Sequence, residues 1–262
     1  MTLGSRFEDA LVYATQTHAS QARKGTGVPY IAHLLAVVSL VLEDGGDEDE
    51  AVAALLHDAV EDQGGEIRLE EIRERYGERV AEIVRECSDT DVTPKPPWRE
   101  RKIAYLGHVP TASAEAVRVS LADKLHNARA VLYDYRRLGE QLWERFNPEA
   151  DQLWYYRSLV TAFRARSDGP LVEELDRVVT ELEQVAGMGA LRKLAADGTG
   201  WVELRAGGGA IRFGPEDVGE AETDEDFREL VRAARVRLYE DLGVAAGAPI
   251  SIVASWRQTA SF

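Results

Sequence analysis

Apolar residues recur at helical spacing through most of the first 185 residues of the chain. In the segments SRFEDALVYA, YIAHLLAVVSLVLED and SLADKLHNARAVLYDYRRLG they return every three or four positions, as on the buried face of an amphipathic helix. Glycine pairs at 45–46 and 64–65 interrupt this pattern, as does the proline-rich segment 91–98. The pattern predicts a mainly α-helical fold with turns at the glycine pairs and a loop at 91–98.

The segment between the two glycine pairs is predicted to form a single helix. It opens with the acidic run 47–50, which favours the positive end of a helix dipole, and continues through AVAALLHDAVED. The next segment, RLEEIRERYGERVAEIVREC, is typical of two short helices hinged at Gly77.

The pattern changes near residue 187. GMGALRKLAADGTG is rich in glycine and predicts a linker or a short helix with a turn. WVELRAGGGAIRF predicts a β-hairpin, DEDFRELVRAARVRLYEDLG a helix and PISIVASW a final strand. The sequence therefore predicts two domains, a helical domain at 1–186 and a small α+β module of unknown role at 187–262.

Composition and charge narrow the classes of function. Apolar residues make up 45% of the 262 residues, and no apolar run approaches the roughly 20 residues that span a bilayer. The chain starts without the features of a signal peptide and has one cysteine, Cys87, so we expect a cytoplasmic protein with no membrane partner. Its 31 basic and 46 acidic residues give a net charge of −15, which argues against nucleic-acid binding. An anionic substrate would need local cations or a metal ion.

The strongest chemical signal is the cluster in ALLHDAVED. His57-Asp58 is followed four residues later by Glu61-Asp62, which on one helix would place the two pairs on a shared face. Burying so many ionisable groups is costly unless a metal ion or a charged partner compensates them. An adjacent His-Asp pair alone would be a weak signal.

Two further residues extend this cluster. His33 lies among apolar residues in YIAHLLAV, where a lone histidine is more often a core residue than a ligand. Asp123 lies in the apolar segment VRVSLADKLHNAR, with Asn127 one turn later. Together with His57 and Asp58 they offer two imidazoles and two carboxylates, a set that suits Mn²⁺ or a similar divalent ion. Without cysteine ligands, a structural zinc site is disfavoured.

Three segments resemble a known family. RKGTGVPYIAHLLAV, ALLHDAVED and LADKLHNAR are similar, in order and spacing, to the hydrolase domain of the RelA/SpoT homologues and to the small alarmone hydrolases of the Mesh1 type. The resemblance covers residues 5 to about 165 and implies an all-helical HD-domain hydrolase with one Mn²⁺. It places the metal ligands on His33, His57, Asp58 and Asp123.

The same resemblance assigns further roles. Glu61 and Asp62 would position and activate the attacking water, and Asn127 would lie near the ribose and the scissile phosphate. Arg23 would stack on the purine and Lys24 would lie near a phosphate. The loop RKGTGVPY has one residue more than the commoner RKSGEPY, so Thr26 is expected to supply a phosphate-contacting hydroxyl.

A looser part of the resemblance adds four substrate contacts, Arg101, Lys102, Arg145 and Tyr155. For the charged members of this set, and for Arg23 and Lys24, the alternative is an ordinary solvated surface position. His18 and His126 also lie in family-like segments, and the resemblance gives them no role.

The resemblance implies hydrolysis of the 3′-pyrophosphate of ppGpp or pppGpp, giving GDP or GTP and pyrophosphate. One alternative keeps the site and changes the substrate, to the 2′-phosphate of NADPH or to an adenosine alarmone. Another is an alarmone sensor without turnover. The sequence leaves open the nucleotide preference and the physiological role, which is either stress recovery or neutralising a toxic synthetase. It also leaves open self-association through the C-terminal module.

Overall fold

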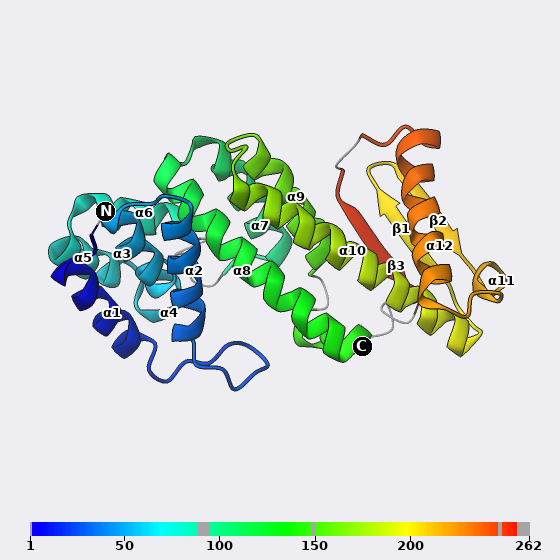
Figure 1. Ribbon diagram of the computed structural model, residues 1–262, viewed down its shortest axis with the longest axis horizontal. Helices are drawn as coiled ribbons and strands as arrows, with labels where there is room; N and C mark the ends of the chain where they lie inside the picture. Colours follow the sequence, from blue (N-terminus) through cyan, green and yellow to red (C-terminus); the bar gives the residue numbers. More distant parts are fainter. Residues whose placement is uncertain (1, 89–94, 148–149, 246–247, 256–262) are drawn as a thin grey trace. The chain divides into compact units, whose positions relative to one another are not determined.

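The computed structural model describes residues 2–88, 95–147, 150–245 and 248–255. The helices are α1 (Ser5–Thr17), α2 (Ile31–Glu43), α3 (Glu48–Leu56), α4 (Ala59–Gln63), α5 (Gly65–Tyr76), α6 (Glu78–Cys87), α7 (Trp98–His108), α8 (Ala114–Leu138), α9 (Gln152–Arg164), α10 (Pro170–Asp197), α11 (Pro215–Val218) and α12 (Asp224–Val236) (Figure 1). The strands are β1 (Val202–Ala206), β2 (Gly209–Phe213) and β3 (Ile250–Ala254). The fold is mainly α-helical with a small sheet near the C-terminus, as the pattern predicts.

The chain divides into two compact units. Unit 1 consists of Met1–Asn127 with Ala162–Leu175, and unit 2 of Ala128–Thr161 with Asp176–Phe262. The predicted boundary at 186/187 falls inside α10, because the glycine-rich segment after residue 186 continues this helix to Asp197. Separate roles for residues 1–186 and 187–262 stay a prediction. The predicted loop at 91–98 lies partly outside the described residues, at 91–94.

Helix α3 is the centre of unit 1. An acidic capping box starts it, in which the Asp47 and Glu50 side chains bond each other's backbone N–H groups. Every residue of the run 51–56 is fully buried, and α3 packs against α1, α2 and α6. A helix that is apolar all round requires such neighbours. Its end therefore delivers the next residues into the interior of unit 1.

The helix that the sequence predicts through 47–63 breaks at His57-Asp58, so the prediction of one continuous helix is wrong. The Nδ1 atom of His57 lies 2.8 Å from the carbonyl oxygen of Ala54, the atom that a continuous helix would bond to the N–H of Asp58. The imidazole thus competes with the helix for this acceptor. Helix α4 begins directly afterwards, at Ala59.

Two short helices follow, as predicted. Helices α5 and α6 meet at Gly77, whose φ of 94° lies in the region that favours glycine. The amphipathic α6 buries Val80, Ile83 and Val84, and it packs against α3 and α5.

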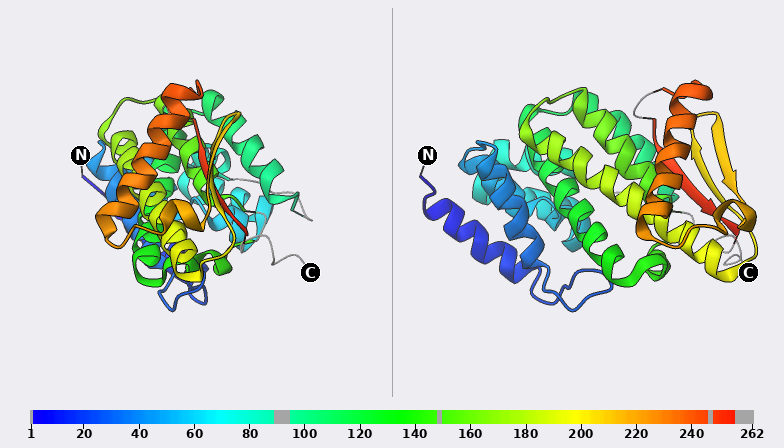
Figure 2. Two further views of the ribbon diagram at one scale, coloured as in Figure 1. Left: turned by 90° about the vertical axis from the view of Figure 1, so that its right-hand side faces the viewer. Right: turned by 45° about the vertical axis from the view of Figure 1, so that its right-hand side comes forward.

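Unit 2 contains the sheet. The described strands pair antiparallel in the order β2-β1-β3, with Leu204 of β1 opposite Ile211 of β2 and Ile252 of β3. The buried residues of β2 and β3 alternate along the strand, whereas β1 also buries Glu203 between Val202 and Leu204, and α12 runs alongside the sheet (Figure 2). A methyl group on Gly187 of α10 would lie 2.9 Å from Val231 of α12, so this glycine permits close packing. The predicted hairpin, helix and final strand are all present.

No helix among the described residues is both long enough and apolar enough to cross a membrane.

Candidate metal centre and nucleotide site

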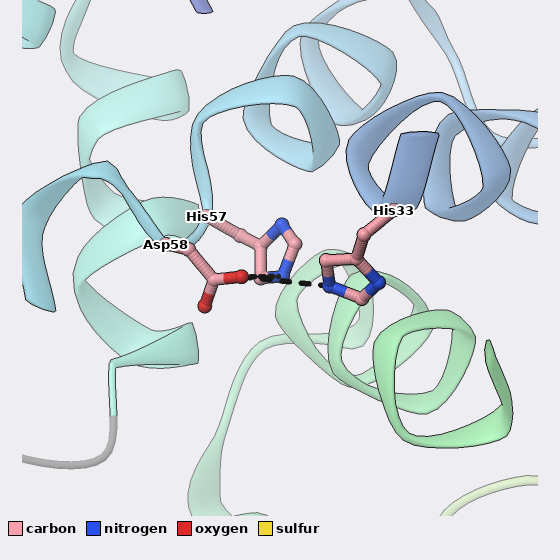
Figure 3. Close-up of side chains that lie close together, drawn as sticks. All are labelled: His33, His57 and Asp58. Atoms are coloured by element: carbon pink, nitrogen blue, oxygen red, sulfur yellow. Dashed lines mark ion pairs between the residues drawn. The ribbon is translucent and has the colours of Figure 1, made fainter. Parts of the chain in front are cut away.

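Three elements of unit 1 bring the predicted metal ligands together. Helix α2 carries His33, the break between α3 and α4 carries His57 and Asp58, and α8 carries Asp123. The ligand atoms of His33, His57 and Asp58 all lie within 4.8 Å of one another (Figure 3). The Oδ1 atom of Asp123 lies 3.2 Å from Nε2 of His33 and 3.7 Å from Nε2 of His57.

The Nε2 atoms of the two histidines point at carboxylates. They lie 3.5 Å (His33) and 3.0 Å (His57) from Oδ2 of Asp58. Both Nε2 atoms are buried, and neither has a hydrogen bond of regular geometry within the described part of the chain. A buried nitrogen without such a partner is costly, and a cation between the imidazoles and carboxylates would satisfy it.

The charges of the cluster are strongly coupled. Burial disfavours the imidazolium form of His57, but Asp58 and Asp123 outweigh this and hold the pKa of His57 well above its usual value. Burial also opposes the ionised form of Asp58, yet His57 holds the pKa of Asp58 well below its usual range. Lys124, 2.6 Å from Asp123 Oδ2, helps to do the same for Asp123. The two carboxylates stay ionised and attract a cation.

The donor set fits a divalent metal ion. Two imidazole nitrogens and two carboxylates form the mixed set that intermediate divalent ions such as Mn²⁺ accept. The Nδ1 of His57 faces the Ala54 carbonyl, which leaves its Nε2 lone pair for a metal. The Tyr30 hydroxyl donates to Asp58 Oδ2 at 2.6 Å and orients this carboxylate.

Helix α4 places Glu61 and Asp62 one turn beyond the break, each with a partner. Lys95 Nζ lies 2.7 Å from Glu61 Oε1. The amide of Gln21 donates to Asp62 Oδ2 at 2.7 Å. Burial raises the pKa of Asp62 above its usual value, and the nearby Asp58 carboxylate adds to this shift. This second pair of carboxylates is therefore next to the cluster of predicted ligands and is not part of it.

The loop between α1 and α2 reaches the site through Arg23. Its guanidinium donates to Asn127 Oδ1 at 2.7 Å, and Asn127 Nδ2 in turn donates to Asp123 Oδ1. Arg23 also lies over the Tyr30 ring, 5.9 Å from its centroid. A chain of hydrogen bonds thus links the nucleotide-binding candidate Arg23 to Asp123, a predicted metal ligand.

Lys24 and Thr26 lie at the exposed tip of the same loop. The Thr26 hydroxyl donates to the Arg23 carbonyl at 3.1 Å and accepts from the Val28 N–H at 3.2 Å. It therefore stabilises the turn, and a phosphate contact from this hydroxyl stays a prediction.

The looser candidates fall in both units. In unit 1, Arg101 and Lys102 are half-buried on α7, and Arg101 Nε donates to the Pro96 carbonyl at 3.2 Å. In unit 2, Arg145 pairs with Asp134 at 2.9 Å, and Tyr155 is buried beside Trp154 and Tyr156. Their roles as substrate contacts stay predictions.

The structure adds residues to the site that the sequence reasoning gave no role. They include Tyr30, Gln21, Lys95, Lys124 and His126. Tyr30, Lys124 and His126 lie inside segments that resemble the family, so a signal existed for these three. Lys95 lies within the proline-rich segment 91–98, and its contact with Glu61 crosses 34 positions of sequence, which no local pattern reveals.

Comparisons with known proteins agree with this geometry. Residues 10–151 match the HD domain family model. The Xenopus tropicalis guanosine-3′,5′-bis(diphosphate) 3′-pyrophosphohydrolase MESH1 is 40% identical over 138 residues, which are 52% of this chain and 72% of MESH1. The Homo sapiens MESH1 is 38% identical over the same shares.

Longer and solved relatives extend the match. A probable guanosine-3′,5′-bis(diphosphate) 3′-pyrophosphohydrolase of Synechocystis is 34% identical over 155 residues, 56% of this chain and 20% of that protein. The structure of a metazoan SpoT ortholog superposes with a TM-score of 0.58 at 25% identity, over 70% of this chain and 98% of its own. The Listeria monocytogenes protein lmo0812 superposes with a TM-score of 0.51 at 30% identity, over 57% and 97%. This chain belongs to the HD domain family, in the branch of the MESH1 and SpoT-type 3′-pyrophosphohydrolases.

Proposed function

We propose that this protein is a Mn²⁺-dependent hydrolase that removes the 3′-pyrophosphate of ppGpp and pppGpp. Water would replace the 3′-ester oxygen at phosphorus, giving GDP or GTP and pyrophosphate. The observation that carries the proposal is the buried cluster of His33, His57, Asp58 and Asp123 beside the Glu61-Asp62 pair. The named activity of the MESH1 relatives supports the choice of substrate.

The four cluster residues would hold the metal ion. When bound, a divalent ion would make a water more acidic and offset negative charge on the phosphoryl group. Glu61 orients the attacking water and takes its proton, which requires that Lys95 release this carboxylate. Asp62, with its raised pKa, is suited to hold and pass on a proton.

Cations of the chain would bind the nucleotide. Arg23 presents a planar guanidinium for stacking on the purine, and Asn127 fixes its position relative to the cluster. Lys24, Arg101 and Lys102 would offset the phosphate charge, with Thr26, Arg145 and Tyr155 as further contacts. Local positive charge is needed because the chain as a whole carries −15.

A nucleotide panel tests the proposal. The protein is incubated with ppGpp, pppGpp, an adenosine alarmone or NADPH, each with Mn²⁺, Mg²⁺ or chelator, and the products are separated by anion exchange. We expect pyrophosphate and GDP or GTP from the guanosine alarmones, with Mn²⁺ the most effective ion. If NADPH is the only nucleotide hydrolysed, with release of inorganic phosphate, the alternative substrate is correct. If an alarmone binds and no product forms, the protein is a sensor.

His57→Ala tests whether the cluster binds the metal ion. Because it removes a proposed ligand, it should lose Mn²⁺ affinity and turnover together. Turnover that survives in His57→Ala would contradict the metal site.

A further inference from the structure

The two ligand histidines of the cluster are oriented by different kinds of neighbour. His57 Nδ1 faces the main-chain carbonyl of Ala54 at 2.8 Å, an acceptor that can only receive a proton. His33 Nδ1 instead faces another ring nitrogen, Nδ1 of His126, at 2.7 Å. The orientation of His33 therefore depends on a side chain that a substitution can change.

The contact between His33 and His126 is a hydrogen bond rather than a stack. The two rings are tilted by 43° with centroids 4.8 Å apart, and the facing nitrogens lie at hydrogen-bond distance. One of them must carry the proton and the other must offer its lone pair, because two N–H groups or two lone pairs would repel each other. This contact couples the tautomers of the two rings.

The choice of tautomer decides whether His33 can bind a metal ion. If His33 Nδ1 donates to His126, the lone pair of His33 lies on Nε2, the atom 3.2 Å from Asp123 and 3.5 Å from Asp58. If His126 donates instead, neutral His33 carries its proton on Nε2 and has no lone pair for a metal. Only the first arrangement completes the ligand set.

Helix α8 is built to present His126 beside the ligand. Asp123, His126 and Asn127 are spaced i, i+3 and i+4 and share one helix face. Asn127 binds Asp123 and His126 binds His33, so one face of α8 supplies a ligand and a neighbour for each of two ligands.

We propose that His126 is a positioning residue of the metal centre, which accepts the Nδ1 proton of His33 and so holds the His33 Nε2 lone pair toward the ion. The inference rests on the metal site of the proposed function, and it does not depend on which nucleotide is the substrate. Neighbours that orient a ligand in this way typically change metal affinity by 10- to 100-fold when removed.

The test compares two substitutions in the full chain. His126→Asn keeps an acceptor, since the asparagine Oδ1 reaches the place of Nδ1, whereas His126→Leu keeps similar bulk without one. Mn²⁺ affinity is measured from the electron paramagnetic resonance signal of free Mn²⁺. We expect affinity roughly 10- to 100-fold weaker in His126→Leu and within about threefold of the parent in His126→Asn. His108→Leu, at an exposed position of α7, is the matched control and should bind Mn²⁺ like the parent.

A second measurement needs no substitution. Nitrogen-15 chemical shifts of the Zn²⁺-loaded parent protein should show His33 protonated on Nδ1 and His126 protonated on Nε2 with a bare Nδ1. These shifts decide the question if His126→Leu does not fold. Parent-like Mn²⁺ affinity in His126→Leu, equal losses in both His126 variants, or a proton on Nδ1 of His126 would each overturn the proposal. A parent protein that binds no divalent ion would refute the metal site itself, and this inference with it.

Discussion

At the scale of single residues, charge and orientation are set by the same contacts. Asp123 receives hydrogen bonds from Lys124 on one oxygen and from Asn127 on the other. Asp58 receives one from Tyr30. Each bond fixes a carboxylate and favours its ionised form. Glu61 and Asp62 are instead held by Lys95 and Gln21, which lie outside the cluster.

Glu61→Gln should separate metal binding from catalysis. The amide keeps the size and one acceptor of Glu61 but cannot take a proton. We expect unchanged Mn²⁺ affinity and a fall in kcat of about 10²-fold or more, the range for loss of a general base. Turnover and Mn²⁺ titration are measured on the same preparation. Glu66→Gln, an exposed glutamate of α5, is the control, and parent-like turnover by Glu61→Gln would refute this role.

Metal binding should release a proton near neutral pH. The pKa of His57 in the metal-free protein is raised well above its usual value of 6.5, so His57 is protonated at pH 7. His57 can bind a metal ion only through a nitrogen lone pair, so the metal ion must displace the proton on this imidazole. Affinity should therefore rise with pH until the raised pKa is passed. Calorimetry in buffers of different ionisation enthalpy should show about one proton released per Mn²⁺ at pH 7, and pH-independent affinity with no release would contradict the prediction.

At the scale of elements, the break between α3 and α4 shapes the site, and glycines in α10 allow close packing in unit 2. His57 and Asp58 lie at the break between α3 and α4 and face His33 of α2. Helix α10 is the opposite case, because it stays continuous through a glycine-rich segment. Two of these glycines, Gly187 and Gly189, leave room for neighbouring side chains.

Gly189→Ala should destabilise unit 2. An added Cβ would lie 2.1 Å from the Tyr135 hydroxyl, which is held by Glu140 at 2.8 Å. Alanine would otherwise favour the helix by about 1 kcal/mol, so a net loss of about 1–3 kcal/mol in the free energy of unfolding would identify overpacking. Adding Tyr135→Phe removes the hydroxyl and should recover part of this loss. Denaturant unfolding of the single and double variants measures the coupling, and additive effects would count against the contact.

At the scale of the whole molecule, the proposed metal ligands and catalytic residues are concentrated in unit 1. Every proposed ligand and catalytic residue lies at or before Asn127, within the residues that match the HD domain family. The metazoan SpoT ortholog, which hydrolyses ppGpp, aligns over 98% of its length with only 70% of this chain. The remaining part of this chain therefore has no equivalent in the aligned region of that relative.

A chain ending at Gly198 should keep Mn²⁺-dependent turnover. This end point leaves α10 whole, whereas an end at Gly187 would cut the helix. Gly187 of α10 faces Val231 of α12 and Ile252 of β3, so removal of the sheet and α12 uncovers this part of α10 and lower stability is expected. If the truncated protein is folded by circular dichroism but inactive, the residues after Gly198 are needed to complete the site.

Phe227→Ala in the full chain gives an independent check of the same prediction. Phe227 is a buried residue of α12, and its truncation should cost about 3–5 kcal/mol of stability. Mn²⁺ affinity at 25 °C should stay at the parent value in the folded protein. Weaker Mn²⁺ binding by folded Phe227→Ala would show that the C-terminal module contributes to the metal site.

Local sequence patterns predicted the helical class, the β-hairpin and final strand of residues 187–262, and the four candidate ligands. These features depend on local periodicity and on residue types that a buried helix does not otherwise tolerate, as at His57, Asp58 and Asp123. The continuation of α10 was not predicted, because glycine lowers helix propensity, and the close approach of Val231 and Ile252 to Gly187 forms only in the folded unit.

The contacts that support the site form only in the folded protein. The break at His57-Asp58 arises because an imidazole takes the Ala54 carbonyl from the helix, a competition that periodicity does not show. Lys95 meets Glu61, Arg23 meets Asn127 and His126 meets His33 across 34, 104 and 93 positions of sequence. Contacts at such separations form only when the helices pack, so they set charge and tautomer at the site in a way that no single segment encodes.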